Sequence, residues 1–494
     1  MERASGILLP VSSLPSAYGI GCFSKDAYEF VDRLAEAGQK YWQILPLGPT
    51  GYGDSPYQSF STFAGNPYFI DPCTLVEEGL LTEEECGSFD FVSHINYVEY
   101  DKIYNGRFSL LRMAYQRFLA DVPQTFYDFC DEQKYWLEDY CLFMAIKTSV
   151  DASGWMDWQK ELRIREQESL AKYKEQLADE INFFRFQQYK FFEQWMKLKA
   201  YANEQGIKII GDVPIYVAKD SADAWCGPEL FQFDEDGKPK GVAGCPPDAF
   251  SATGQLWGNP LYDWEYHEKT EYAWWVNRIR HCFRLYDVVR IDHFRAFDAY
   301  YSIPATDETA ENGQWEQGPG MKLFRCLKEM LGELDIIAED LGFLTPSVYE
   351  LLASTGYPGM KVLQFAFDES EDSEYLPHKY VENCVAYTGT HDNETSEGWY
   401  AAISDRERSF VNDYLGYAPQ DRERFSMRFA RAAMASNAKL CVIPLQDYLG
   451  LGNEARINHP STVGANWKWR MSKGAFTPEL AKEIKRLTGL YGRA

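Results

Sequence analysis

A run of β-branched residues ends directly in ionisable side chains at VVRIDHF, residues 288–294. Arg290 and Asp292 are two positions apart, so on a strand their side chains point to the same side. Burying charges at the end of a strand costs free energy unless they are paired. A guanidinium beside Asp292 favours the ionised carboxylate, which is the form that a nucleophile requires. The stretch therefore predicts a reactive carboxylate.

Further carboxylates follow four other apolar runs, and each of them alone is most simply a solvated surface group. The runs are GIKIIG, DIIA, MKVLQFAF and NCVAYTGT, and the groups after them are Asp212, Glu339 with Asp340, Asp368, and His391 with Asp392. If the runs are strands of one closed barrel, their ends converge, and crowded carboxylates then acquire different pKa values. We expect one site at this rim.

Two chemistries suit crowded carboxylates. They can bind a metal ion, with His293 and His391 as nitrogen ligands. They can also act as a nucleophile and a general acid on the two sides of a glycosidic bond. Arg290 weakens a cation site, and burial after DIIA should raise the pKa of Glu339 and keep it protonated as an acid. The residues favour the second chemistry.

Three segments place aromatic residues among glycines and amides, namely SPYQSF (55–60), GQLWGNP (254–260) and GANWKWR (464–470). Core packing is the usual role of a tryptophan. Trp257, in a Gly/Pro-rich segment, is a poor candidate for the core. Flat rings stack on the apolar faces of sugars while amides bind the hydroxyls, so these segments predict a sugar-binding surface.

Eight apolar runs alternate with helical patterns along the chain. The runs are continuous rather than alternating, which is typical of parallel strands covered on both faces. Helices are expected at 24–37 and 179–205 and after Thr345 and Thr477, where a threonine cap precedes a proline. The pattern predicts an α/β fold, a (β/α)8 TIM barrel. An open doubly wound sheet is the alternative.

Two intervals between predicted strands are too long for ordinary connections. Strand 2 ends near Pro46 and strand 3 begins near Ile207; strand 3 ends near Asp212 and strand 4 begins near Asp287. We therefore expect one catalytic barrel over residues 1–494 with two insertions. Residues 72–180 are predicted to be a mainly helical subdomain, and residues 216–275 a loop-rich lid.

Composition excludes some partners. The formal charge of -25 disfavours nucleic acid and anionic membranes. Eleven cysteines without a CxxC pair indicate reduced thiols. The first residues lack the pattern of a signal peptide, and no stretch has the length of a transmembrane span. We expect a cytoplasmic protein.

Six segments together resemble the 4-alpha-glucanotransferase family, also called amylomaltase or disproportionating enzyme. They are RIDHFR, AEDLG, TGTHDNET, GDVPIYV, LWGNPLY and SPYQSFSTFAGNP, and the resemblance runs from LLPVSSLPS to STVGANWKWR. It implies a barrel of the alpha-amylase superfamily with helical insertions, without that superfamily's usual C-terminal β-domain. It also implies that no metal and no cofactor is required.

The resemblance implies roles for individual residues. The family's nucleophile falls on Asp292, its acid/base on Glu339, and its third carboxylate on Asp392. The substrate-binding positions that it implies are Arg290, His391, Asp212, Tyr57, Ser55, Trp257, Asp340, Asp368 and Asn466.

The implied activity is transfer of α-1,4-glucan segments from one maltooligosaccharide, starch or glycogen-type chain to the 4-hydroxyl of another, by a retaining double displacement. An α-1,4-glucan hydrolase on the same scaffold is the main alternative. An inactive glucan-binding protein and a metal-dependent barrel hydrolase are weaker ones. The expected assembly is a monomer or a weak homodimer.

Overall fold

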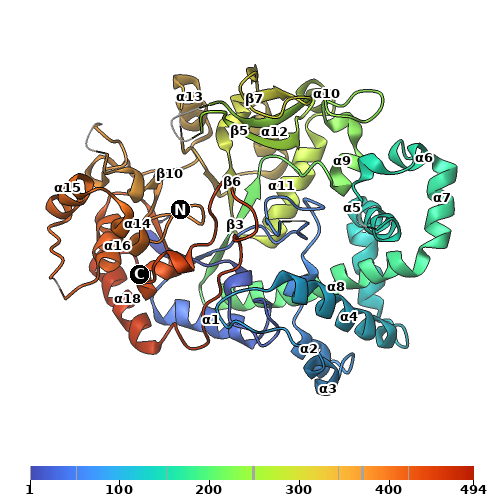
Figure 1. Cartoon of the computed structure of the whole chain (residues 1–494), viewed down its shortest axis with the longest axis horizontal. Coiled ribbons are helices and arrows are strands. Elements are labelled where there is room, and N and C mark those ends of the chain that lie inside the picture. Colours follow the sequence, from blue (N-terminus) through green and yellow to red (C-terminus); the bar gives the residue numbers. More distant parts are fainter. Residues whose placement is uncertain are drawn as a thin grey trace.

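A parallel eight-stranded sheet forms the centre of the molecule (Figure 1). The computed structural model describes residues 2–51, 53–151, 153–247, 251–342, 344–368, 372–420 and 422–494. The strands are β1 (Ala4–Leu8), β2 (Tyr41–Gln43), β3 (Lys208–Pro214), β6 (Val288–Asp292), β9 (Ile336–Ala338), β10 (Gly359–Val362), β11 (Cys384–Tyr387) and β12 (Leu440–Pro444). Their order is β10-β11-β12-β1-β2-β3-β6-β9.

The two end strands of this sheet meet and close it into a barrel. The backbone N–H of Ala338, at the end of β9, donates to the carbonyl of Pro358, directly before β10, over 3.0 Å. Each of the eight predicted runs overlaps one of these strands. The predicted (β/α)8 barrel is therefore confirmed, and the open-sheet alternative is wrong.

Alternation along each strand divides its side chains between two environments. On β6, Val288 lies in the barrel interior with Ile210 of β3 and Ile337 of β9. Its neighbours Val289 and Ile291 belong to the larger core between the barrel and the surrounding helices. Arg290 and Asp292 continue the inward series at the end of the strand, because successive side chains point to opposite faces. The apolar side chains inside the barrel are thus followed, at the C-terminal end of the strand, by charged side chains.

The principal surrounding helices are α1 (Lys25–Glu36), α8 (Ala178–Glu204), α11 (Ala273–Leu285), α12 (Met321–Leu331), α13 (Pro346–Thr355), α14 (Ser396–Ala402), α15 (Asp405–Leu415), α16 (Phe425–Ala435), α17 (Leu445–Leu449) and α18 (Pro478–Leu490). The Thr477 side chain caps α18 by accepting from the N–H of Leu480 over 3.2 Å. Thr345 occupies the N-cap position of α13, but its hydroxyl pairs with that of Ser347 instead of capping the helix.

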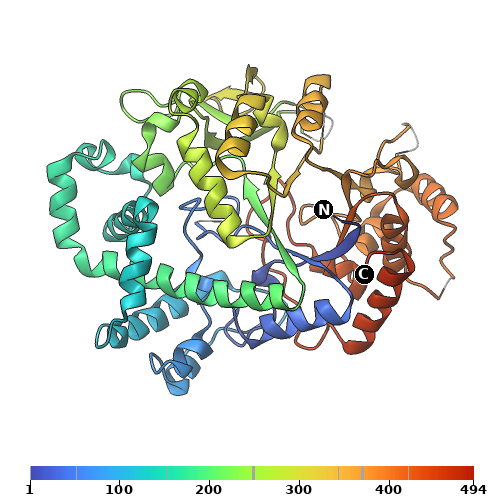
Figure 2. The ribbon, with the colours of Figure 1, turned by 180° about the vertical axis from the view of Figure 1, so that it is seen from behind.

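Residues 72–180 are mostly helical and extend to one side of the barrel (Figures 1 and 2). The helices are α2 (Pro72–Glu77), α3 (Glu83–Gly87), α4 (Tyr100–Phe118), α5 (Gln124–Ser149), α6 (Lys160–Arg163) and α7 (Gln167–Gln176). Despite this long interval, β2 and β3 pair directly, with Trp42 opposite Ile209. The interval therefore does not interrupt the barrel.

A second sheet was not anticipated from the sequence. The segment expected to be loop-rich contains α9 (Ala222–Cys226), β4 (Gly241–Cys245), β5 (Gln255–Pro260) and α10 (Trp264–Lys269). The two strands join β7 (Ala299–Pro304) and β8 (Gln314–Gln317) in an antiparallel sheet of order β5-β4-β7-β8. The sequence GVAGC of β4 is rich in glycine, which is a weak strand signal.

Along the described ranges, no helix is both long and apolar enough to cross a membrane. Within the same residues, no disulfide joins any of the cysteines.

Candidate active site

Three neighbouring strands deliver charged side chains to one end of the barrel. Asp212 of β3 lies opposite Arg290 of β6 in the parallel register. On the other side of β6, Ile291 lies opposite Ala338, and the N–H of Glu339 donates to the Ile291 carbonyl over 3.0 Å. Asp292 and Glu339 are the next residues of these two paired strands. The structure thus brings them together at one rim.

Arg290 joins two of the carboxylates. Its Nη1 atom lies 2.7 Å from each oxygen of Asp212 and 3.1 Å from Oδ1 of Asp292. Arg290 and Asp212 are almost completely buried, at 2% and 1% exposed. The sequence predicted the pairing with Asp292 but not the closer contact with Asp212, which holds the guanidinium in place.

The pKa of Asp292 reflects two opposing effects. Burial raises the pKa of this carboxyl to about 6, with Arg290 opposing the shift and Asp212 and Asp392 adding to it. Arg290 was expected to hold Asp292 ionised. With a pKa of about 6 the carboxyl is still ionised at neutral pH, although the same burial that strengthens the ion pair also penalises the charge.

The carboxylate of Glu339 is held by two backbone groups. Oε2 accepts from the N–H of His293 over 2.6 Å, and Oε1 accepts from the N–H of Leu341 over 2.9 Å. Burial, followed by repulsion from Asp292, raises the pKa of Glu339 to about 7 in spite of these bonds. The direction agrees with the sequence prediction. Because the two groups interact, they titrate as a pair, with Glu339 the more readily protonated member.

Asp392 follows β11 and is kept ionised by its neighbours. His391 Nε2 lies 3.3 Å from Oδ2 of Asp392, and Asn458 Nδ2 donates to Oδ1 over 2.6 Å. Burial raises the pKa of Asp392, but His391 and Asn458 outweigh it and lower the pKa to about 2. Arg456 also donates to the Asp392 carbonyl over 2.8 Å. The contacts of Arg456 and Asn458 with Asp392 were not predicted, because nothing in the spacing of these two residues indicates them.

Tyr57 contacts both Asp212 and His391. Its hydroxyl donates to Asp212 Oδ2 over 2.8 Å. Its ring stacks on His391, with centroids 5.2 Å apart and planes 17° from parallel, and Trp467 lies 5.8 Å from it. Ser55 supports this loop, because its hydroxyl accepts the N–H of Tyr57 over 3.3 Å.

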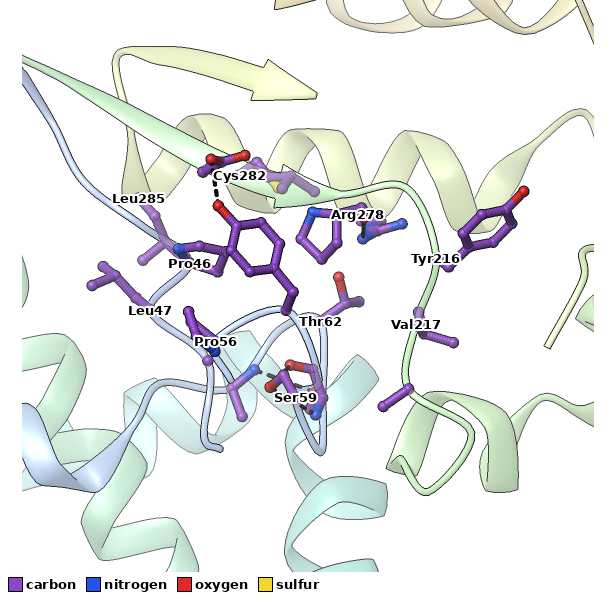
Figure 3. Close-up of a pocket in the computed structure, with 18 of the residues that line it drawn as sticks. Pro46, Leu47, Pro56, Ser59, Thr62, Tyr216, Val217, Arg278, Cys282 and Leu285 are labelled. Carbon is purple, nitrogen blue, oxygen red and sulfur yellow. Dashed lines mark hydrogen bonds between the residues drawn. The ribbon is translucent and has the colours of Figure 1, made fainter. Parts of the chain in front are cut away.

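Tyr57 and Asp212 are among the residues that line a cavity of about 50 Å³, which is drawn in Figure 3. It separates the loop that carries Pro46 and Pro56 from Cys282 and Leu285 of α11. The volume exceeds that of one water-sized probe. A space of this size therefore adjoins both the Tyr57 loop and the end of β3.

Trp257 contacts the residue that follows Asp292. It meets the His293 ring edge-on at 4.8 Å and 88°. His293 follows Asp292 directly and has a left-handed backbone with φ of 55°. The sequence placed Trp257 in a loop, whereas the structure places it in β5, half-exposed. The ring is thus presented beside the Asp292–Glu339 pair.

Three further residues were predicted to bind substrate. Asp340 accepts the N–H of Met360 over 2.6 Å and so links β9 to β10. Asn466 accepts the N–H of His459 over 2.9 Å and holds the turn before Trp467. Asp368 is exposed beyond β10. A role for these three residues in substrate binding stays a prediction.

The two histidines considered as metal ligands contact a tryptophan and a carboxylate, respectively. Among the described residues, no group of three or more His, Cys, Asp or Glu side chains is placed to share a metal ion.

A model of the family described as 4-alpha-glucanotransferase matches residues 9–476. The chain belongs to this family. A 4-alpha-glucanotransferase from Clostridium butyricum is 50% identical over 485 residues, covering 98% of this chain and 99% of its own length. The Thermus thermophilus member is 45% identical and covers 99% and 98%. The family resemblance inferred from the sequence is therefore confirmed.

Solved structures agree with this membership. The amylomaltase from Streptococcus agalactiae in complex with acarbose is 41% identical, covers 100% of both chains and has a TM-score of 0.97. The amylomaltase from Corynebacterium glutamicum, at 18% identity, covers 98% of this chain and 75% of its own, with a TM-score of 0.79. The second likeness shows that the fold is shared.

Proposed function

We propose that the protein transfers α-1,4-glucan segments between glucan chains, and that Asp292, Glu339 and Asp392 carry the chemistry. The observation that supports this most directly is the placement of two half-buried carboxyl groups on adjacent strand ends, with the pKa of Glu339 raised above that of Asp292. One group is suited to attack and the other to donate a proton. Membership in the 4-alpha-glucanotransferase family supplies the reaction class.

In the first step, a carboxylate oxygen of Asp292 attacks the anomeric carbon of the donor glucan. The glycosidic bond breaks, and the proton of Glu339 passes to the departing 4-oxygen. A glycosyl ester on Asp292 results. This double displacement requires two carboxyl groups about 5–5.5 Å apart, a spacing that neighbouring residues on paired strands can provide.

In the second step, the now ionised Glu339 takes the proton from the 4-hydroxyl of an acceptor sugar. The acceptor oxygen attacks the anomeric carbon and releases Asp292 as a carboxylate. The two displacements retain the configuration of the anomeric carbon. Glu339 ends protonated, ready for the next donor.

Asp392 and Arg290 have supporting electrostatic roles in this proposal. Asp392 remains ionised at neutral pH, so it can bind sugar hydroxyls and stabilise the positive charge that develops on the ring. Arg290 is fixed by Asp212 and orients Asp292. We further propose that Tyr57, His391 and Trp257 bind the sugar rings, and that acarbose, found with the Streptococcus agalactiae relative, is a ligand here too.

Incubation with maltotriose tests the proposal. Transfer predicts glucose together with maltopentaose and longer products, since each donor loses part of its chain to another molecule. A mixture of only glucose and maltose would show that water is the acceptor and would support the hydrolase alternative.

The domain boundaries and the cellular location remain proposals. We propose that residues 72–180 and 216–275 are insertions in a single catalytic unit, which is supported by the direct pairing of β2 with β3 and of β3 with β6. Cysteines without disulfides are compatible with the proposed cytoplasmic location. Maltooligosaccharides, starch and glycogen-type glucans are the proposed substrates of a monomer or weak homodimer.

A further inference from the structure

A groove lies between α15, α16 and the 3-10 helix Pro377–Lys379. It consists of two adjoining hollows of about 490 Å³ and 590 Å³, which share Ala435, Ser436 and Asn437. Hollows of this size are typical of small-molecule sites. Nothing in the proposed catalytic mechanism uses these residues.

The groove opens at the end of the barrel opposite the candidate active site. Its second hollow is lined by Arg3, Glu382 and Lys439. Arg3 precedes β1, Glu382 precedes β11, and Lys439 precedes β12, so all three lie at the N-terminal ends of strands. Asp292, Glu339 and Asp392 follow the C-terminal ends, where barrel enzymes place their chemistry. The groove is therefore a separate feature.

One wall of the groove is an aromatic side chain held in place. The Tyr414 hydroxyl lies 3.0 Å from Nδ1 of the exposed His378. The Tyr414 ring also packs edge-on against Phe367, with centroids 5.6 Å apart. Tyr491 lines the same hollow. A ring that is already ordered loses little conformational entropy when a ligand stacks on it.

Planar hydrogen-bonding groups lie beside these rings. Arg428 and Arg431 line the groove and share the carboxylate of Glu423, with Arg428 Nε 3.2 Å from Oε2. The three side chains together carry one net positive charge. The exposed Asn437 adds an amide at the junction of the two hollows.

The combination fits a neutral sugar chain better than an anion. Tyrosine faces match the apolar faces of glucose, and guanidinium and amide groups match its hydroxyls. A single net positive charge gives little attraction for a polyanion on a protein of formal charge -25. We propose that this groove is a second α-glucan-binding site, which anchors a distant part of a long donor or acceptor chain.

This inference rests on the proposed function, because it takes the substrate class from it. Its consequence is specific to length. A trisaccharide cannot occupy both ends of the barrel, whereas a polymer gains apparent affinity from two linked sites. Blocking the groove should therefore raise the KM for starch and leave kcat/KM for maltotriose unchanged.

The test uses Ala435→Lys, with Ala402→Lys as the matched control. Each alanine is exposed and is the last residue of its helix, α16 and α14 respectively. A lysine is favourable at a helix C-terminus, so both variants should fold. Only the first variant places a long side chain in the groove. Electrophoresis with and without amylopectin in the gel measures binding, and the sugar-free gel corrects for the added charge.

We expect amylopectin to retard Ala435→Lys clearly less than the wild type and Ala402→Lys equally to it. The KM for soluble starch should rise about tenfold in Ala435→Lys, with kcat/KM for maltotriose unchanged. His378→Ala, which releases Tyr414, should shift both readings in the same direction and serves as a second variant if Ala435→Lys does not fold.

Equal retardation of Ala435→Lys and wild type would overturn the groove proposal. Calorimetric binding of inorganic phosphate to the wild type that is lost in Arg431→Gln would overturn it as well, in favour of an anion site. Failure of the wild type to disproportionate maltotriose would instead refute the proposed function, so the two failures are distinguishable.

Discussion

The charged residues at the strand ends and the aromatic residues Tyr57 and Trp257 are held by different kinds of structure. Asp212 and Arg290 are almost completely buried, and each is held by bonds to more than one partner. Tyr57 and Trp257 are half-exposed, on a loop after β2 and on an edge strand of the second sheet. Charges that must stay within tenths of an ångström of a reacting atom lie on strands, whereas rings that must admit different sugars lie on more adaptable segments.

The largest expected effect is at the strand ends. Asp292→Asn removes the proposed nucleophile, and kcat on maltotriose should fall by about 10⁴-fold or more. Asp121→Asn makes the same change on an exposed carboxylate after α4, away from the site, and should alter kcat by less than about threefold. Similar losses in both variants would refute Asp292 as the nucleophile.

Glu339→Gln should separate proton donation from nucleophilic attack. The rate on maltotriose should fall by about 10³-fold, a typical contribution of general acid catalysis. With α-glucosyl fluoride, whose leaving group needs no proton, attack by Asp292 should persist. We expect a burst of fluoride and a mass increase of one glucosyl unit, and the absence of both would refute the assignment.

The pH profile tests the protonation states of the pair. Asp292 must be ionised, so kcat/KM should fall as pH drops below about 6. Glu339 must be protonated in the free enzyme, so kcat/KM should fall as pH rises above about 7. Each limb should approach a tenfold change per pH unit. A flat profile up to pH 9 would contradict Glu339 as the acid.

Tyr57→Phe should have the smallest effect on kcat/KM, and it tests the aromatic residues of the site directly. The change removes the bond to Asp212 and keeps the ring on His391. Loss of one hydrogen bond to a charged group, about 1.5 kcal/mol, predicts roughly a tenfold lower kcat/KM. Ser55→Ala, which removes only a weak bond within the loop, should change kcat/KM by less than about twofold. A 10³-fold loss of kcat/KM in Tyr57→Phe would show that the Tyr57 hydroxyl is as important as the charged residues at the strand ends.

Local patterns in the sequence were sufficient for the barrel and for its charged rim. Continuous apolar runs marked all eight strands, and carboxylates directly after them marked the converging ends. The second sheet was missed because β4 is short and glycine-rich and pairs with β7, far along the chain. Arg456 and Asn458 were missed because a loop residue that supports Asp392 leaves no periodic signal.

The sequence by itself determined the order of strands and the residue types at their ends, because apolar periodicity and short-range chemistry are local properties. Only the tertiary structure decided which charges touch. It turned Asp340 toward Met360, joined Arg290 to Asp212, and raised the pKa of Asp292 through burial. Such outcomes depend on burial and on distances between segments far apart in the chain, and neither quantity is present in a linear sequence.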